Sequence, residues 1–301
     1  MKDQVRQANV SAGWILPLFF AFVFVGAMVL GPLMYAAAHL IHPEPFHRVM
    51  DRALLVSVLA TLAFFWPRIP AAQLWPFGRR ACVQVAFGYG LALVSVQLVI
   101  GLGLALCGFT SAHLNGGQVA ARLGMALLAA LLVPPLEETV FRGFVLGELA
   151  PAIGRRWGCI VAALIFMLAH FLKIPESLDH QRVHFWSGIT ATVAAFGPLV
   201  QGGFLGWRGL NLFLLGLILG GVFLRSGSLW ISAALHSGLI LAMLLFSGLT
   251  RPVDPPRVAF FAGNLDSTPL TALVLILLGA WLWRYYPPPS DDTPESGASA
   301  P

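Results

Sequence analysis

Long uninterrupted apolar runs constrain this chain more than any other feature of its sequence. The runs 14–40 and 81–107 are each 27 residues long and carry no Lys, Arg, Asp or Glu, and the shorter run 210–224 is also uncharged. A helix of about 20 apolar residues crosses a hydrocarbon core about 30 Å thick. Only 10% of the residues are charged, which is too few to cover a water-facing surface. The sequence therefore predicts an all-α protein, a polytopic transmembrane helical bundle.

About eight spans are predicted, within a range of seven to nine. The first apolar run is longer than the core of a cleavable signal peptide, about 7–15 residues, so we expect it to remain as a span. A ninth apolar stretch, 189–207, is interrupted by glycines and a proline and is interpreted as a re-entrant or short span. The predicted spans are 14–40, 53–67, 81–107, 118–150, 157–172, 210–225, 228–248 and 268–286.

The predicted organisation is a membrane domain with a short tail at each end. Residues 1–13 form an N-terminal tail, residues 14–286 form the membrane domain, and residues 287–301 form a C-terminal tail. The C-terminal tail is rich in Pro, Ser and acidic residues, a composition typical of disorder. With nine spans, a count of Lys and Arg in alternate loops favours a cytoplasmic N-terminus, whereas with eight spans the count does not decide the orientation. The predicted location is the cell (inner) membrane.

The formal net charge of +5 does not indicate a nucleic-acid partner. Sixteen of the 18 basic residues are Arg, and they are scattered singly through short loops. That pattern is typical of anchoring at the ends of spans, and it lacks a basic stripe with interleaved aromatic residues. Cys82, Cys107 and Cys159 lie in or beside apolar runs, so they are interpreted as small buried hydrophobes without a disulfide framework.

The acidic residues point to the chemistry, because there are only 13 of them. Ten are assigned to termini or loops, Asp51 among them, and Glu148 falls near the end of its span. Glu137 and Glu138 instead lie deep in the predicted span 118–150, where a carboxylate costs about 3 kcal/mol. Arg142, four residues after Glu138, offers it an ion pair of the favoured order.

That ion pair is either structural support or part of a site, and it does not explain Glu137, which is displaced by about 100° around the helix. Pro134-Pro135 precede the two glutamates and predict a kink beside a hydrated cavity. His170 and His236 fall within predicted spans, whereas the other six histidines fall at span ends or in loops. A glutamate acting as general base on water, assisted by histidine, fits these residues best.

Metal-dependent catalysis and serine catalysis fit the sequence less well than a glutamate base does. HExxH is absent, and the glutamates and histidines lie far apart in sequence, so no metal ligand set and no cofactor is predicted. Gly227-Ser228 has no matching histidine motif beyond His236, so serine catalysis is not favoured either.

Three short blocks resemble the CAAX prenyl endopeptidase and bacteriocin-processing (CPBP, or ABI) family of intramembrane proteases. The first block, 137–142, reads EETVFR and matches the EExxxR motif of that family. The second, 166–170, reads FMLAH and matches its FxxxH motif. The segment 216–236, which ends in His236, is similar to its third block. The resemblance covers about 118–248, the CPBP-like core of the membrane domain.

The resemblance implies a role for each matched residue. Glu137 would polarise the attacking water, and His170 would hold and deprotonate it. His236 would help to stabilise the oxyanion of the tetrahedral intermediate. The residues that would support the site are Glu138, Arg142 and Phe166.

The chain departs from the family pattern at one position. The family carries Asn or Asp four residues after the second histidine, where this chain has Ile240, and an isoleucine side chain cannot donate a hydrogen bond. Ser237, Asn211 or a backbone amide are the alternative donors.

The predicted function is that of an intramembrane endopeptidase, a hydrolase. Its partners would be the lipid bilayer and a membrane-associated protein or peptide substrate, cleaved in CAAX-type C-terminal processing, in bacteriocin or sorting-signal processing, or in a related reaction. Two alternatives stay open: a non-catalytic membrane binding or immunity protein that keeps the protease scaffold, and a proton-coupled transporter.

Overall fold

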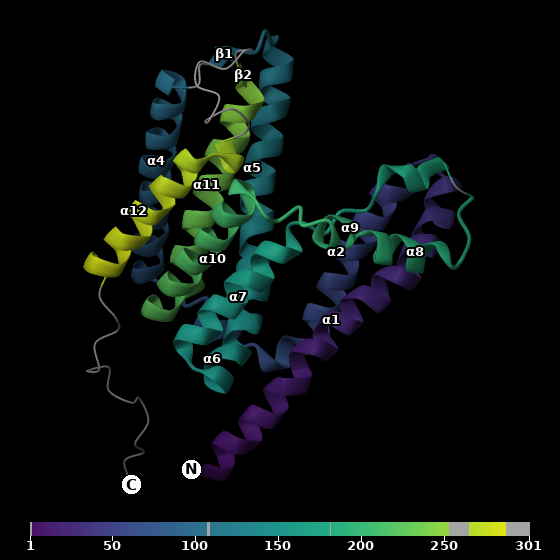
Figure 1. The fold of residues 1–301 in the computed structure, drawn as a ribbon, viewed down its shortest axis with the longest axis horizontal. Coiled ribbons are helices and arrows are strands. Elements are labelled where there is room, and N and C mark those ends of the chain that lie inside the picture. The colour runs from purple at the N-terminus through teal and green to yellow at the C-terminus, as the bar shows by residue number, and fades with distance from the viewer. Residues whose placement is uncertain (1, 107–108, 181, 253–264, 287–301) are drawn as a thin grey trace. The chain divides into compact units, whose positions relative to one another are not determined.

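The structure is a computed structural model that describes residues 2–106, 109–180, 182–252 and 265–286 (Figure 1). Helices make up nearly all of the described chain, and one two-stranded sheet accompanies them, which confirms the predicted all-α class. The chain divides into two compact units, and each is described by itself. Unit 1 comprises Met1–Ala71, Leu136–Leu217 and Asp266–Pro269, and unit 2 comprises Ala72–Pro135, Ile218–Leu265 and Leu270–Pro301.

Most of the candidate site residues fall in unit 1. Its elements are α1 (Lys2–His39), α2 (Phe46–Phe65), η1 (Trp66–Arg68), η2 (Thr139–Leu146), α6 (Gly147–Ile153), α7 (Arg155–Ala169), η3 (Glu176–His180), α8 (Ser187–Ala194), α9 (Gly197–Val200) and the first half of α10 (Trp207–Ser226). The short turn η5 (Leu265–Ser267) lies at its boundary with unit 2.

The two long helices α1 and α2 pack along each other because small residues allow a close approach. Ser57 on α2 donates a hydrogen bond to the carbonyl of Val23 on α1 (2.7 Å), next to Gly26. The helix α8 also lies close to α1: a Cβ atom on Gly188 would clash with the carbonyl oxygen of Met28. A side chain larger than glycine therefore cannot be accommodated at residue 188 unless the helices move apart.

An aromatic cluster attaches η2 to the α1–α2 pair. Phe19 of α1, Phe65 of α2 and Phe144 of η2 have ring centroids 4.7–5.7 Å apart. All three side chains are buried, and buried aromatic rings contribute large apolar areas together with a preferred geometry. The segment that follows the glutamate pair is thereby fixed against two membrane-length helices.

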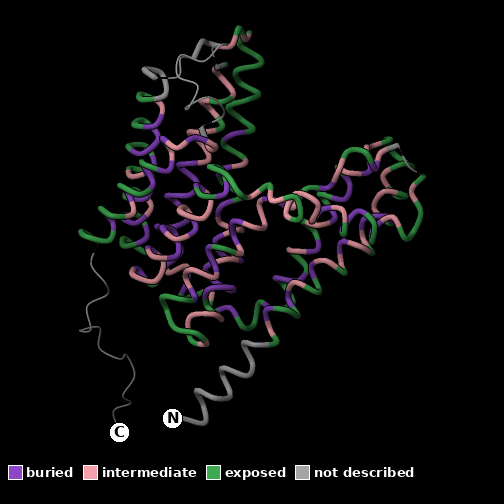
Figure 2. Tube along the Cα trace, in the orientation of Figure 1, coloured by how far each residue is buried: buried purple, intermediate pink, exposed green. Residues whose placement is uncertain are grey.

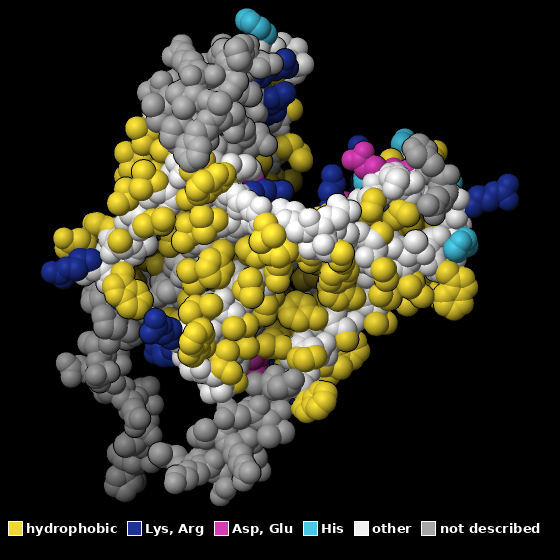
Figure 3. Space-filling model, in the orientation of Figure 1, with side chains coloured by type: hydrophobic (Ala, Val, Ile, Leu, Met, Phe, Trp, Pro, Cys, Tyr) yellow, Lys and Arg dark blue, Asp and Glu magenta, His cyan; other side chains and the backbone are white. Residues whose placement is uncertain are grey.

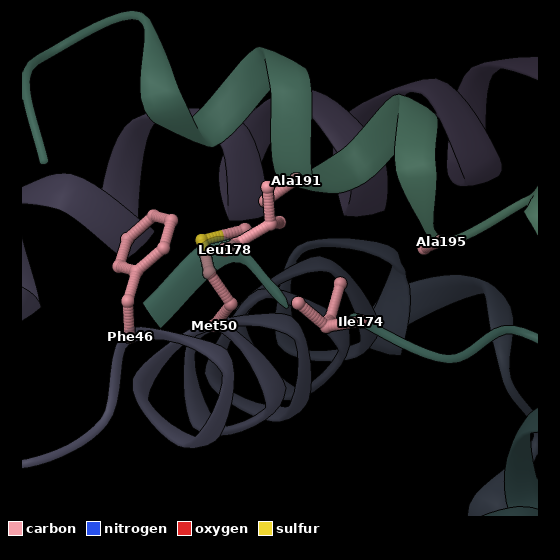
Figure 4. Packing of buried hydrophobic residues seen from close by; sticks show 6 residues of the cluster. All are labelled: Phe46, Met50, Ile174, Leu178, Ala191 and Ala195. Atoms are coloured by element: carbon pink, nitrogen blue, oxygen red, sulfur yellow. The ribbon is translucent and has the colours of Figure 1, made fainter. Parts of the chain in front are cut away.

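A second cluster supports the segment that follows α7. Phe46 and Met50 of α2 pack against Ile174 and Leu178, which lie between α7 and α8 and in η3 (Figure 4). Ala191 of α8 and Ala195 at its end complete this cluster. Hydrophobic packing therefore joins residues 174–195 to α2.

Unit 2 is built around α4 and α11. Its elements are α4 (Arg79–Leu106), β1 (Phe109–Ser111), most of α5 (Gly116–Glu138), the second half of α10, α11 (Leu229–Leu249), β2 (Thr250–Pro252) and α12 (Pro269–Tyr285), preceded by the short α3 (Ala71–Leu74) at its boundary. The strands β1 and β2 pair antiparallel, with Thr110 opposite Arg251.

Close packing and a helix cap fix α11 against α4. A Cβ atom on Gly88 would stand 2.8 Å from the carbonyl oxygen of Ile231, so the two helices approach closely there. The N-terminus of α11 is capped by Ser228, whose hydroxyl accepts from the backbone of Trp230 (3.3 Å) and donates to Gln84 of α4 (3.0 Å). This packing buries the half of α11 that carries His236 (Figure 2).

Among the described residues, six helices are long and apolar enough to cross a membrane: Trp14–His39, Phe46–Arg68, Arg79–Leu102, Gly116–Ile153, Trp207–Ser226 and Leu229–Leu249. Hydrophobic side chains spread over most of the visible face, as expected for a lipid-facing surface (Figure 3). The predicted spans 157–172 and 268–286 correspond to α7 and α12, which have 15 and 17 residues. Both are shorter than the about 20 residues that a span needs.

Two further predictions can be compared with the helices. The assignment of Asp51 to a loop is wrong, because α2 begins at Phe46, seven residues before the predicted start of that span. The stretch 189–207 contains most of α8 and all of α9, two short helices. The predicted C-terminal tail, 287–301, and Cys107 lie outside the described residues.

Candidate active site

The two glutamates end α5, and a π-helix begins directly after them. The helix α5 continues through Pro134 and Pro135 to Glu138, and η2 then has π geometry over eight residues. Proline lacks the N–H that an α-helix requires, so two carbonyls of the preceding turn lose their usual donors. π-turns are rare and are frequent at functional sites. The helix continues through both prolines, and its geometry changes only after the carboxylates; the kink and the hydrated cavity stay predictions.

Glu138 and Arg142 form a sealed ion pair within this turn. The Arg142 Nη1 atom donates to Glu138 Oε1 at 2.8 Å, and the two side chains are 3% and 0% exposed. Arg142 Nη2 also donates to the backbone carbonyl of Gly216 on α10 (3.3 Å). The structure thus confirms that residues four apart are paired, and it adds a third partner from a distant part of the chain.

His170 is positioned by the end of α7. The helix ends at Ala169, and the backbone N–H of His170 bonds to the carbonyl of Met167 in a tightened last turn (3.1 Å). The ring Nδ1 atom lies 2.8 Å from the carbonyl oxygen of Phe166. A carbonyl oxygen only accepts, so Nδ1 carries the proton, and in the neutral imidazole Nε2 is the basic nitrogen.

That basic nitrogen faces the other glutamate. His170 Nε2 lies 3.9 Å from Glu137 Oε2, and the two side chains are 26% and 23% exposed. Two polar groups that lie more than about 3.5 Å apart do not bond directly, but a water molecule can bridge them. Glu137 and His170 therefore form a partly open pair that can hold a water by both of its hydrogens.

Phe166 connects the sealed ion pair with the open pair. Its backbone carbonyl fixes the His170 ring, and its side chain is fully buried beneath the Arg142 guanidinium, 4.5 Å from the ring centroid. The Phe166 ring also packs edge-on against Phe141, at 5.1 Å. A cation over an aromatic face is favourable, so the EExxxR and FxxxH segments hold each other in register.

Gly216 is a supporting residue that sequence reasoning missed. A Cβ atom there would lie 2.9 Å from Cα and Cβ of Ala163, so α10 lies very close to α7 at this point. That approach brings the Gly216 carbonyl within reach of Arg142. The sequence offers no signal for it beyond the position of Gly216 at the start of the third block.

The side chains considered for stabilising the oxyanion lie on α10 and α11. His236 is buried on α11 in unit 2, and Ile240 follows one turn later on the same helix, half-buried. Asn211, in unit 1, donates its amide to the backbone carbonyls of Asp266 (2.8 Å) and Thr268 (3.1 Å), so its N–H groups hold a loop. Ser237 is buried on α11. The oxyanion roles of His236 and of its neighbours stay predictions.

No group of three or more His, Cys, Asp or Glu side chains that could hold a metal ion occurs within the described ranges. The Glu137–His170 pair supplies two groups that can bind a water or a proton.

Comparison with known proteins agrees with this arrangement. Residues 118–242 match the family model described as type II CAAX prenyl endopeptidase Rce1-like, so this segment is similar to that family, in agreement with the resemblance drawn from the three motifs. No curated protein and no solved structure matches the chain significantly. With six membrane-length helices among its described residues, the chain is an integral membrane protein.

Proposed function

We propose that this protein is an intramembrane endopeptidase that hydrolyses a peptide bond of a membrane-associated protein or peptide, with water activated by Glu137 and His170. The observation that carries the proposal is the 3.9 Å spacing of Glu137 Oε2 and His170 Nε2, within a segment that is similar to a family of endopeptidases. The family description supports a CAAX-type prenylated protein as the substrate class that we propose.

The chemistry follows from the orientation of the two groups. A water between them donates one hydrogen to the carboxylate and one to the imidazole, so its lone pair is directed away from both. Attack on the scissile carbonyl forms the C–O bond, and the proton passes to the Glu137–His170 pair. The same pair returns that proton to the departing amine when the C–N bond breaks.

The residues that surround the catalytic pair support it in different ways. Glu138 and Arg142 do not touch the reacting atoms; they fix the π-turn that carries Glu137. Phe166 fixes the His170 ring through its carbonyl. His236 is proposed to stabilise the oxyanion, the role that the family pattern implies.

The test is a cleavage assay with purified protein in detergent. The substrate is an internally quenched peptide that contains S-farnesyl cysteine followed by three apolar residues, and mass spectrometry locates the cut. We expect release of a short C-terminal peptide by the wild type and none by Glu137→Gln. Absence of cleavage by a folded wild type, across prenylated and unprenylated peptides, would favour the non-catalytic alternative.

The same assay tests the absence of a metal requirement. Because the proposed water is held by a carboxylate and an imidazole alone, we expect EDTA and phenanthroline to leave the rate unchanged. A loss of turnover that zinc restores would show that the site is a metalloprotease.

A further inference from the structure

A cleft of about 480 Å³ lies in unit 1 just beyond the end of α7. Its volume falls within the range of ligand pockets, about 300–1,000 Å³. Three polar side chains line it, Lys173, Glu176 and Gln201, together with small and apolar residues of the α8–α9 segment. The cleft therefore combines an apolar wall with a few polar groups, as binding sites do.

The walls of the cleft are attached to the packed core of the unit. The backbone N–H of Lys173 donates to the carbonyl of Ala195 (3.1 Å), which joins the two sides. The next residue, Ile174, and Ala195 itself both belong to the cluster on α2 (Figure 4). The cleft is thus built on fixed backbone.

Its charged groups are available to a ligand. Lys173 and Glu176 are exposed, and neither forms a salt bridge with another of the described side chains, although Lys173 acts on Asp51 electrostatically. Charged side chains are costly within the bilayer core, so this end of the unit belongs to the membrane–water interface. Charged and His side chains gather at that end, at the upper right of Figure 3.

The distance from the catalytic pair to the cleft sets which part of a substrate can reach it. Lys173 follows His170 by three residues, and three residues span at most about 11 Å even when fully extended. Because this is an upper limit, an extended substrate whose scissile carbonyl lies at the Glu137–His170 pair reaches the cleft within about three residues. Resting on the proposed function, we propose that the cleft binds the substrate within about three residues of the scissile bond, with Lys173 paired to a carboxylate there.

The three polar side chains suit a peptide that carries such a carboxylate. Lys173 supplies three N–H donors and a positive charge, whereas Glu176 and the Gln201 carbonyl accept from peptide N–H groups. The carboxylate has two sources, the C-terminus of a substrate that ends there or an acidic side chain of a longer one. Lys173 is a specificity-determining residue in either case.

The test measures binding separately from cleavage. In the Glu137→Gln background, fluorescence anisotropy gives the affinity for three dye-labelled S-farnesyl cysteine peptides in detergent. All three extend three residues beyond the cysteine. One ends in a carboxylate, one in an amide, and one in an amide with glutamate as its last residue.

We expect at least one carboxylate peptide to bind about fivefold more tightly than the amide, the effect of one partly exposed charge pair. Adding Lys173→Gln should remove that preference, and Lys173→Arg should keep it. Arg52→Gln, which removes an exposed Arg on α2 that does not line the cleft, should leave it unchanged. Which carboxylate is preferred identifies its source.

Equal binding of the three peptides, or a preference that survives Lys173→Gln, would overturn the inference. Failure of the proposed function has a different signature, because it would show as absent cleavage by the wild type or as cleavage by Glu137→Gln. Each hypothesis can therefore be rejected independently of the other.

Discussion

Glu137 and Glu138 are neighbours in the chain, yet their surroundings differ almost completely. Glu138 is fully enclosed, with Arg142 at 2.8 Å, whereas Glu137 is about a quarter exposed and faces His170 at 3.9 Å. A short, sealed ion pair is a structural arrangement that leaves no room for a substrate. The longer, partly exposed pair is the one that we propose to hold the water. On the proposed function, one carboxylate therefore supports the site and the other carries the chemistry.

The two regions depend on each other through shared elements. Arg142 lies over the Phe166 ring, and the Phe166 carbonyl orients His170. A change in the sealed pair is therefore expected to alter stability first and activity as a consequence. A change in the open pair is expected to alter activity alone.

The largest expected effect is the loss of activity in Glu137→Gln. Glutamine keeps the size of the side chain but cannot take a proton, so kcat should fall by the about 10²–10⁴-fold that general acid–base catalysis contributes. Because Glu137 is partly exposed, Tm in detergent should stay near that of the wild type. Wild-type turnover in this variant would remove Glu137 from the mechanism.

Glu138→Gln should act in the opposite way. It leaves the Arg142 charge buried without its carboxylate, which costs about 3–5 kcal/mol. Thermal unfolding in detergent measures the loss, and Glu148→Gln, a half-buried glutamate on α6, is the matched control. A stable Glu138→Gln protein with greatly reduced kcat would place Glu138 in the chemistry and break the comparison.

The sequence predicts the ion pair better than it predicts the open pair. Residues four apart on a helix are neighbours, so the contact between Glu138 and Arg142 follows from spacing alone. Glu137 and His170 are 33 positions apart, and their approach depends on how α7 ends and on a hydrogen bond to a backbone carbonyl. The spacing of two residues in the sequence does not predict such an approach. The prediction that Glu137 and His170 act together comes from the family resemblance.

The limits of prediction for the fold have the same cause. Apolar runs predict helices and membrane spans because the cost of exposing backbone to lipid is local and large. The position at which a helix begins depends on tertiary contacts, so Asp51 was placed in a loop although it lies in the second turn of α2. The π geometry of η2 and the close approach of α10 to α7 at Gly216 also depend on tertiary contacts, and no residue pattern predicts them.

Gly216→Ala tests the attachment of the sealed pair to α10 and should have a smaller effect. A methyl group at 2.9 Å from Ala163 forces α7 and α10 apart, and such overpacking costs about 1–3 kcal/mol. Arg142 would lose its bond to the Gly216 carbonyl, so Tm and kcat should both fall moderately. Gly221→Ala on the same helix is the control, because a Cβ atom there meets nothing within 4 Å. Equal effects of the two substitutions would show that the close approach has no role.

The smallest expected effect concerns a group that neither pair supplies, a donor to the oxyanion. Arg142 is committed to Glu138 and to a backbone carbonyl, and the Asn211 amide holds a loop. His236 is the donor that the family resemblance implies, and Ile240 lies one turn further along the same face of α11. Ile240→Asn adds a donor at the position where the family carries one. A well-placed donor is worth about 2.7–4 kcal/mol, but the pocket is adapted to an apolar side chain, so we expect a several-fold gain in kcat.

Ile240→Leu controls for repacking, since it changes the shape of the side chain without adding a donor. Turnover and thermal stability are measured together for both variants. If Ile240 instead packs against a neighbouring helix or lipid, the asparagine amide is buried without a partner, which costs about 1–3 kcal/mol. A less stable Ile240→Asn protein with no gain in kcat would show that residue 240 lies outside the site. The oxyanion donor would then be His236 alone or a backbone N–H, and the departure from the family pattern would have no catalytic consequence.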